Sequence, residues 1–140
     1  MGNGFLAFVI YRTKCISVVS RIEARSEKYD LFMEVDVNTE MYPIKEEEKF
    51  VVLLTYTLNA DGSADGGSYS QGRKGTIEDK YEYIMCGRLY NIREDGSGND
   101  RKTEIYVSFG GLLMLLKGHP SCLSQFQLQQ QLYLCMKKLI

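Results

Sequence analysis

The segment EIYVSFGGLLMLLKG, residues 104–118, constrains the fold more than any other part of the chain. Between residues 105 and 116 only Ser108 is hydrophilic, and Gly110 and Gly111 cut the apolar stretch in half. Before the glycines, one apolar set alternates with other residues at the period of two that predicts a strand with one buried face: Ile105, Val107 and Phe109. Residues 112–117 predict a second strand, and the glycines permit a sharp corner between the two that residues with a Cβ would resist. A strand that turns a corner is what closure of a small barrel requires.

The rest of the chain predicts more strands and almost no helix. Strand patterns cover residues 17–25, 31–38, 50–58, 81–92 and 132–140, and the apolar stretch 5–11 is a further candidate. We expect Gly87 to mark a bulge or bend, residues 93–100 to connect a hairpin, and residues 119–126 to form a short helical turn. Residues 59–80, with five glycines, predict one long mobile loop. The prediction is a single all-β domain over 1–140, an antiparallel closed barrel of seven or eight strands.

Composition and charge exclude several classes of protein. The net charge of -1 gives no bulk attraction to nucleic acid or to an anionic membrane. The apolar stretch 5–11 is too short to span a bilayer, lacks the preceding positive charge of a signal peptide, and places Leu6 where myristoylation needs Ser or Thr. No two cysteines have the spacing of a zinc or redox pair, so we expect reduced packing residues: Cys15, Cys86, Cys122 and Cys135.

No motif predicts catalysis, a cofactor or a metal. Residues 61–66 imitate the start of a calcium loop, but the twelfth position would be Gly72 rather than a bidentate glutamate. Residues 67–73 approach a phosphate-binding loop without its lysine or its flanking helix. His119 has no indicated catalytic partner, and the acidic run 46–48 predicts a solvated turn. A barrel without a reactive site favours a binding or structural subunit.

Two binding functions remain open from the residues alone. Tyr81, Tyr83, Tyr90 and Tyr106 could form an aromatic face for single-stranded nucleic acid, as in small barrels of the oligonucleotide-binding type. Tyrosine is equally enriched at protein interfaces. We favour a protein partner, because carboxylates offset the few basic residues along these strands.

The chain resembles one known family along most of its length. The residues that carry the resemblance begin with Ser20-Arg21 and Asp36-Val37-Asn38, continue through Tyr42-Pro43 and YEYIMCG (81–87), and end with YVSFGGLLM (106–114) and YLCMKKL (133–139). They resemble the eighth common subunit shared by eukaryotic nuclear RNA polymerases I, II and III, and plant members in particular. The resemblance implies a barrel related to the oligonucleotide-binding fold, no catalysis of its own, and a location in the nucleus, including the nucleolus. It also implies docking on the largest polymerase subunit, with no direct contact to nucleic acid.

For the partner interface we predict a set of residues on the strands around the twin glycines: Tyr90, Tyr106, Phe109, Gly110, Gly111, Leu112 and Met114. The glycines would allow a partner's backbone to approach closely. Packing in the barrel core is the alternative role for most of this set.

The resemblance starts only near residue 18. Family members open with an acidic, aromatic strand and a turn, whereas residues 1–17 have no early acid and no such turn. A divergent copy, an alternative first exon or a misplaced start would each account for this segment. A nonfunctional truncated paralogue is therefore a third functional class, one that predicts poor solubility and no complex. If the segment supplied no strand, a sheet edge would be left unpaired.

Overall fold

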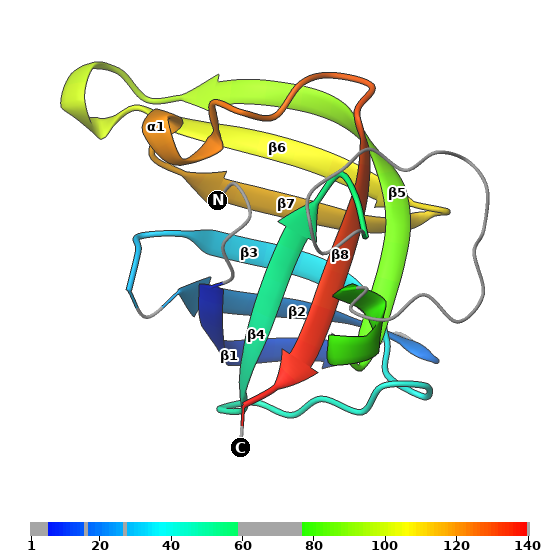
Figure 1. The fold of residues 1–140 in the computed structure, drawn as a ribbon. Helices are drawn as coiled ribbons and strands as arrows, with labels where there is room; N and C mark the ends of the chain where they lie inside the picture. The colour runs from blue at the N-terminus through cyan, green and yellow to red at the C-terminus, as the bar shows by residue number, and fades with distance from the viewer. Residues whose placement is uncertain (1–5, 16, 27, 59–76, 140) are drawn as a thin grey trace.

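The fold is a closed barrel of eight antiparallel strands, in the order β1-β2-β3-β7-β6-β5-β8-β4 (Figure 1). This computed structural model describes residues 6–15, 17–26, 28–58 and 77–139. The strands are β1 (Leu6–Cys15), β2 (Val19–Ser26), β3 (Phe32–Asn38), β4 (Lys49–Thr55), β5 (Tyr83–Asp95), β6 (Lys102–Phe109), β7 (Leu112–Gly118) and β8 (Gln131–Lys138). The predicted all-β barrel is confirmed, and each predicted strand has its counterpart.

The connections also follow the sequence patterns, with differences at their ends. The connection between β5 and β6 is a hairpin that includes a 3-10 turn, η2 (Gly98–Asp100), and the short helix α1 (Pro120–Leu123) precedes β8. Strand β4 ends before residue 58, because the Thr55 hydroxyl donates to the Thr57 carbonyl and accepts from the Thr57 N–H. Residues 59–76 of the predicted mobile loop lie outside the described part of the chain. Residues 77–80 form a 3-10 turn, η1 (Ile77–Lys80).

One continuous core fills the barrel, and it forms because alternate residues of each strand point inward. In β6 the buried residues alternate with half-buried ones along the whole strand. The largest fully buried side chains come from nearly every strand, among them Phe8, Ile22, Met33, Phe50, Leu89 and Leu116. This alternation leaves the opposite set of side chains on the outside of the barrel, where a partner can reach them.

The outer side of β4 and β8 is covered rather than open. A second apolar cluster of Leu53, Tyr133 and Cys135 lies there, with Leu58, Ile77, Tyr81 and Ile84 packed against it. In Figure 1, η1 lies beside β8 on this side of the barrel. Strand β4 is therefore buried on both faces, as its unbroken apolar sequence predicts.

The unusual amino-terminal segment supplies the strand that closes the barrel. Residues 6–9 of β1 pair with β4, and residues 8–15 pair with β2. The Phe8 ring packs against the Phe50 ring with a centroid distance of 6.2 Å. The sequence left this strand in doubt, and the structure shows that Leu6–Cys15 form it, because β4 and β2 pair with its two edges and Phe8 and Ile10 enter the core.

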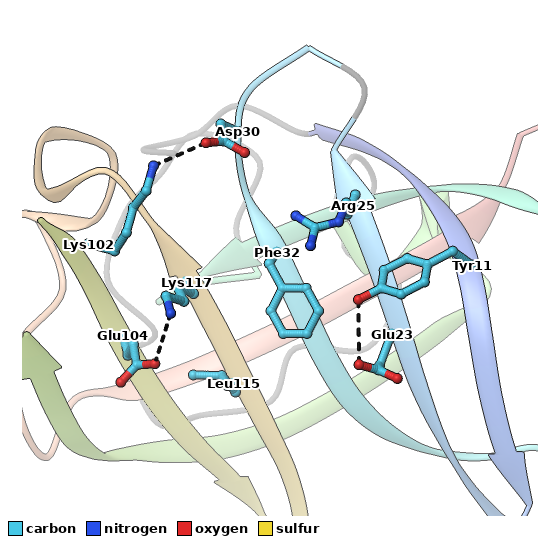
Figure 2. A pocket seen from close by; sticks show the side chains of 9 residues that line it. All are labelled: Tyr11, Glu23, Arg25, Asp30, Phe32, Lys102, Glu104, Leu115 and Lys117. Atoms are coloured by element: carbon cyan, nitrogen blue, oxygen red, sulfur yellow. Dashed lines mark hydrogen bonds and ion pairs between the residues drawn. The ribbon is translucent and has the colours of Figure 1, made fainter. Parts of the chain in front are cut away.

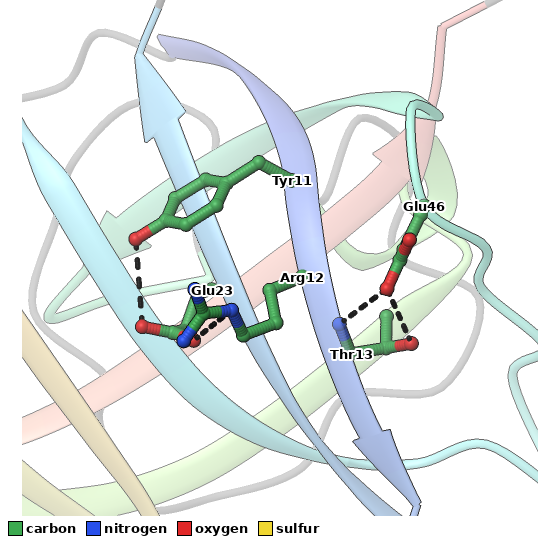
Figure 3. A network of polar contacts seen from close by, with 5 residues as sticks. All are labelled: Tyr11, Arg12, Thr13, Glu23 and Glu46. Carbon is green, nitrogen blue, oxygen red and sulfur yellow. Dashed lines mark hydrogen bonds and ion pairs between the residues drawn. The ribbon is translucent and has the colours of Figure 1, made fainter.

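The acidic run after Pro43 forms the solvated turn that the sequence predicts, and its backbone is also docked on β1. The Glu47 N–H donates to the Ile10 carbonyl, and the Ile10 N–H donates to the Glu48 carbonyl. Beyond this point the Glu46 carboxylate accepts from the Thr13 N–H at 3.1 Å and from its hydroxyl at 3.4 Å (Figure 3). A side chain thus satisfies the edge of β1 where β4 no longer follows it.

The strands predicted on either side of the twin glycines are both present, but the glycines join them by a hairpin reversal rather than by the expected corner. Phe109 pairs with Leu112, so Gly110 and Gly111 are the two central residues of the β6–β7 hairpin. Their φ angles are +63° and +106°. Two positive φ angles define the type I′ turn, which matches the twist of adjacent strands and favours glycine. Within this chain an added Cβ would meet nothing within 4 Å at either position, so backbone conformation alone requires these glycines.

A bulge or bend was expected at Gly87, and the bulge lies three residues further along, at Tyr90. The register of the β5–β6 pair shifts between Leu89 and Asn91, which makes Tyr90 the extra residue. At Gly87 an added Cβ would lie 2.2 Å from the Ser108 carbonyl oxygen. Gly87 therefore permits a close backbone approach near the point where β5 passes from β8 to β6 as its neighbour.

We predict that Gly87→Ala destabilises the protein more than Gly118→Ala. The new methyl at residue 87 would collide with backbone, whereas at residue 118 it would meet the end of the Leu31 side chain, which can move. Overpacking costs about 1–3 kcal/mol, and we expect Gly87→Ala at or above the top of that range and Gly118→Ala near the bottom. Urea unfolding followed by circular dichroism measures both. Equal losses for the two variants would contradict the close approach.

Candidate protein-binding surface

The outer side of β3, β7, β6 and β5 is the part of the barrel on which the predicted interface residues fall. The Tyr90 and Tyr106 rings are brought together there, with centroids 6.1 Å apart. Tyr90 is 45% exposed, and the Tyr106 hydroxyl donates to the Glu104 carboxylate. Gly110 and Gly111 are exposed at the adjacent hairpin tip. These four residues form one surface, which no other described element covers.

The other three predicted interface residues point into the barrel. Phe109 is 6% exposed and Met114 is 2% exposed, and both belong to the core. Leu112 is half-buried and packs against the same core. Phe109 lies two residues after Val107 and four after Ile105, so its side chain faces inward like theirs. Because Phe109 pairs with Leu112, Leu112 and Met114 face inward on β7 as well. The residues that β7 shows to the outside are instead Leu113, Leu115 and Lys117, which the interface prediction did not include.

These residues enclose a small hollow on the outer face. It has a volume of about 150 Å³, and it is lined by Arg21, Glu34, Tyr90, Tyr106, Leu113, Met114 and Leu115, so the predicted residue Met114 also borders it. We call Tyr90, Tyr106, Gly110, Gly111 and Leu113 the hairpin patch. It combines exposed aromatic and aliphatic side chains with the bare backbone of a glycine turn. Tyrosine and leucine side chains around a hollow favour recognition of another protein.

An ion pair between neighbouring strands fixes the position of the hairpin patch. Arg21 on β2 donates from Nε to Asp36 Oδ1 at 2.7 Å and from Nη2 to Oδ2 at 3.1 Å. The Leu113 N–H donates to Asp36 Oδ2 at 3.0 Å. The backbone pairing of β3 with β7 ends at Val35 and Met114, one residue before this point. The Asp36 carboxylate therefore replaces the missing backbone acceptor and holds the start of β7 against β3.

The electrostatics of Asp36 agree with this role. Burial opposes ionisation of the carboxyl, but the hydrogen bonds from Arg21 and from the Leu113 N–H, with the positive charge of Arg21, outweigh it and lower the pKa of Asp36. Only 9% of the Asp36 side chain is exposed. The sequence offered a signal for this pair, since both residues carry the family resemblance, but it assigned them no contact.

A second, larger hollow adjoins the first on the same outer face. Its volume is about 440 Å³, and Leu115 lines both hollows. Figure 2 shows Arg25 between the rings of Tyr11 and Phe32, with ion pairs at the opposite wall. The Tyr11 hydroxyl donates to Glu23 at 3.4 Å, and Arg12 Nε lies 3.4 Å from the same carboxylate (Figure 3). Tyr11 is the extra residue at a register shift between β1 and β2, as Tyr90 is in β5.

The four tyrosines considered as a nucleic-acid face do not share one surface. Tyr81 packs on the second apolar cluster outside β4 and β8. Tyr83 stacks on Tyr42 with a centroid distance of 5.1 Å, and its hydroxyl accepts from the Asn38 N–H. Only Tyr90 and Tyr106 lie together. A continuous aromatic platform for successive bases is therefore not formed by this set.

Within residues 6–15, 17–26, 28–58 and 77–139, no group of three His, Cys, Asp or Glu side chains could hold a metal ion. No helix in that part of the chain has the length and apolar character needed to cross a membrane.

Comparison with known proteins gives a consistent set of relatives. The family described as RNA polymerase Rpb8 matches residues 9–138. An Arabidopsis thaliana protein named DNA-directed RNA polymerases II, IV and V subunit 8B is 53% identical over 121 residues, 86% of this chain and 82% of that protein. A Caenorhabditis briggsae protein named probable DNA-directed RNA polymerases I, II, and III subunit RPABC3 is 40% identical over the same shares. A Dictyostelium discoideum subunit rpabc3 of the same three polymerases is 37% identical, again with 86% and 82% covered.

We predict that Asp36→Asn destabilises the protein at neutral pH and that the loss shrinks in acid. Leaving the Arg21 guanidinium without its carboxylate should cost about 1–3 kcal/mol at pH 7. Because the pKa of Asp36 is lowered below its ordinary 3.8, its contribution is complete above that value and is lost as pH falls through the folded-state pKa. Urea unfolding at pH 7 and at successively lower pH measures the difference between the proteins.

Asp95→Asn is the matched control, because Asp95 is also paired with a cation, Lys117, but lies exposed. We expect a much smaller loss of stability from this change. Equal effects of the two substitutions, or an Asp36→Asn deficit that grows on acidification, would contradict the role given to Asp36.

Proposed function

Because the chain belongs to the RNA polymerase Rpb8 family, we propose that it is a subunit of DNA-directed RNA polymerase that serves assembly and structure rather than chemistry. The observation that carries the proposal is the family match over residues 9–138, joined to 53% identity with a plant polymerase subunit. The match includes most of β1, so the segment that departs from the family at its start still takes the place of a family strand.

We further propose that the chain docks on the largest polymerase subunit through the hairpin patch. A closed barrel has few free strand edges, so it must bind mainly through outward side chains and turns. The hairpin patch supplies an aromatic pair, Leu113 at 39% exposure, and a turn without side chains. Centrally placed aromatic residues contribute most of the free energy in many protein interfaces. Phe109 and Met114 support this surface from inside the barrel.

The names of the relatives suggest which enzyme to test. The Arabidopsis relative is named for polymerases II, IV and V, whereas the worm and Dictyostelium relatives are named for I, II and III. Polymerase II is common to both groups, so we propose it as a partner of this chain. Its location would then be the nucleus. A share in polymerase I would add the nucleolus.

A free barrel that binds single-stranded nucleic acid is not favoured. The relatives are named as polymerase subunits, and the outer face carries Glu23, Glu34 and Glu104 among its basic residues. Carboxylates at these positions would repel a phosphate backbone, which supplies most of the affinity in such complexes.

We predict that the full chain with an affinity tag recovers the largest subunit of polymerase II from Arabidopsis nuclear extract. Replacing both Tyr90 and Tyr106 by alanine should weaken recovery at least tenfold, since loss of a central aromatic pair costs about 2 kcal/mol or more. Quantitative immunoblotting over a dilution series of the extract measures the retained fraction.

Tyr56→Ala is the matched control, because Tyr56 is 52% exposed and follows β4, away from the hairpin patch. It should leave recovery unchanged. Recovery of no polymerase subunit by the unmodified chain would overturn the proposed function. Tight, strongly salt-dependent binding of a fluorescent single-stranded oligonucleotide by the purified chain would support the alternative instead.

A further inference from the structure

The larger hollow on the outer face, which we call the Arg25 pocket, combines apolar walls with one cation in an unusual setting. Tyr11, Phe32 and Leu115 provide the apolar walls, from β1, β3 and β7 (Figure 2). The Arg25 guanidinium carbon lies 5.5 Å from the centroid of the Tyr11 ring and 5.4 Å from that of the Phe32 ring. Its two aromatic neighbours place the guanidinium at the wall of a hollow large enough for a side chain.

The other charged groups of the Arg25 pocket already have partners. Lys102 Nζ lies 3.0 Å from Asp30 Oδ2, and Lys117 Nζ lies 2.7 Å from Asp95 Oδ2 and 3.7 Å from Glu104 Oε2. Glu23 is held by Arg12 and by the Tyr11 hydroxyl. Lys117–Glu104 and Arg12–Glu23 join neighbouring strands, whereas Lys102–Asp30 and Lys117–Asp95 reach across one intervening strand, so all of them belong to the barrel itself.

Arg25 differs from the other cations of this hollow. No carboxylate in the described part of the chain lies within ion-pair distance of it, and its side chain is exposed. Contact with aromatic rings restrains a guanidinium by its faces and leaves its N–H edge free to donate. A planar, restrained guanidinium recognises a carboxylate through two parallel hydrogen bonds. The preferred ligand of this group is therefore a single carboxylate.

We propose that the Arg25 pocket binds an acidic side chain of a polymerase subunit, with a neighbouring apolar side chain of the same segment packed between Phe32 and Leu115. This inference rests on the proposed function for the identity of the complex, and it adds a second recognition site with its own chemistry. Because Leu115 lines both hollows, an extended segment seated in the Arg25 pocket could continue toward the hairpin patch. The partner segment would carry Asp or Glu beside a large apolar residue.

The charges of the pocket favour such a segment over a nucleic acid or another polyanion. Its lining holds three cations, Arg25, Lys102 and Lys117, and three carboxylates, Glu23, Asp30 and Glu104. The balance leaves no strong field to attract a chain of phosphates, and the three carboxylates would repel one. A single carboxylate can instead accept two parallel hydrogen bonds from the Arg25 guanidinium. The apolar surface beside Arg25 would remain unfilled by a phosphate backbone.

Photo-crosslinking of the full chain tests the inference. The photoreactive residue p-benzoylphenylalanine replaces Phe32 in the tagged protein, which is irradiated in Arabidopsis nuclear extract before purification and mass spectrometry. We expect an adduct with a polymerase subunit, on a peptide with Asp or Glu within about three residues of the attachment point, since Arg25 and Phe32 are in contact. Arg25→Ala in the same protein should lower the adduct yield about tenfold.

Two further variants test whether the effect of Arg25→Ala comes from the planar shape of the guanidinium, from its charge, or from a general loss of an arginine. Arg25→Lys keeps the charge but loses the planar fork, so it should recover only part of the yield. Arg101→Ala removes an arginine that is paired with Glu94, outside the pocket, and should leave the yield unchanged. Because Arg25 is exposed, its variants should unfold at the same urea concentration as the unmodified chain.

The possible failures are distinguishable. Polymerase recovery without an adduct at residue 32, an adduct on a peptide without nearby acids, an adduct with nucleic acid, or a yield unchanged by Arg25→Ala would each overturn the inference and leave the proposed function standing. Failure of the unmodified chain to recover any polymerase subunit would overturn both.

Discussion

Closure of the barrel depends on β1, because this strand must pair along both of its edges at once. Its first residues pair with β4 and its later residues pair with β2. The Phe8 ring packs on the Phe50 ring in the core, where β1 meets β4. Without β1, both β2 and β4 would present an unpaired edge, and an apolar strand such as β4 with a free edge invites aggregation. The departure of this segment from the family pattern therefore has limits. Its sequence can vary, but it must remain a strand with inward apolar residues.

Closure also divides the outside of the barrel into two regions with different roles. The outer face of β4 and β8 is apolar and is covered within the chain by the segment around η1. The outer face that runs from β1 to β5 is amphipathic and is not covered by any described element. Both hollows lie on it, and both register shifts of the barrel place a tyrosine there, Tyr11 in β1 and Tyr90 in β5. A bulge redirects a side chain without breaking the barrel, so each bulge adds an aromatic group to this face.

The sequence predicted the barrel because its main signal, alternation with a period of two, is also the signal for which side chains face the core. The alternation was sufficient to place Phe109 inside the barrel, beside Ile105 and Val107. With a two-residue turn at the glycines, the same alternation also places Met114 inside. The interface prediction included Phe109 and Met114 because it followed the family resemblance rather than the alternation, and the structure buries both side chains in the core.

Other features could not be predicted from local patterns. The bulge at Tyr90 arises where β5 changes from one neighbour to another, and Gly87 is required by the carbonyl of Ser108, which lies twenty-one residues away in sequence. Closure by β1 depends on how β1 aligns with β2 and with β4. The pattern of apolar residues in β1 does not specify either alignment. The contacts of Asp36 likewise depend on where the pairing of β3 with β7 ends.

Arg21 and Arg25 show how one strand can contribute separately to stability and to recognition. Both lie on β2, four residues apart, with their side chains on the same outer face. Arg21 donates twice to the Asp36 carboxylate, whose Oδ2 also accepts from the β7 backbone, so the charge of Arg21 is already paired within the chain. At Arg25 the cross-strand neighbours are Val9 and Phe32, which offer no carboxylate. The aromatic rings hold the guanidinium in place, and no carboxylate among the described residues pairs with it. Free donors on an ordered side chain are what a binding site requires.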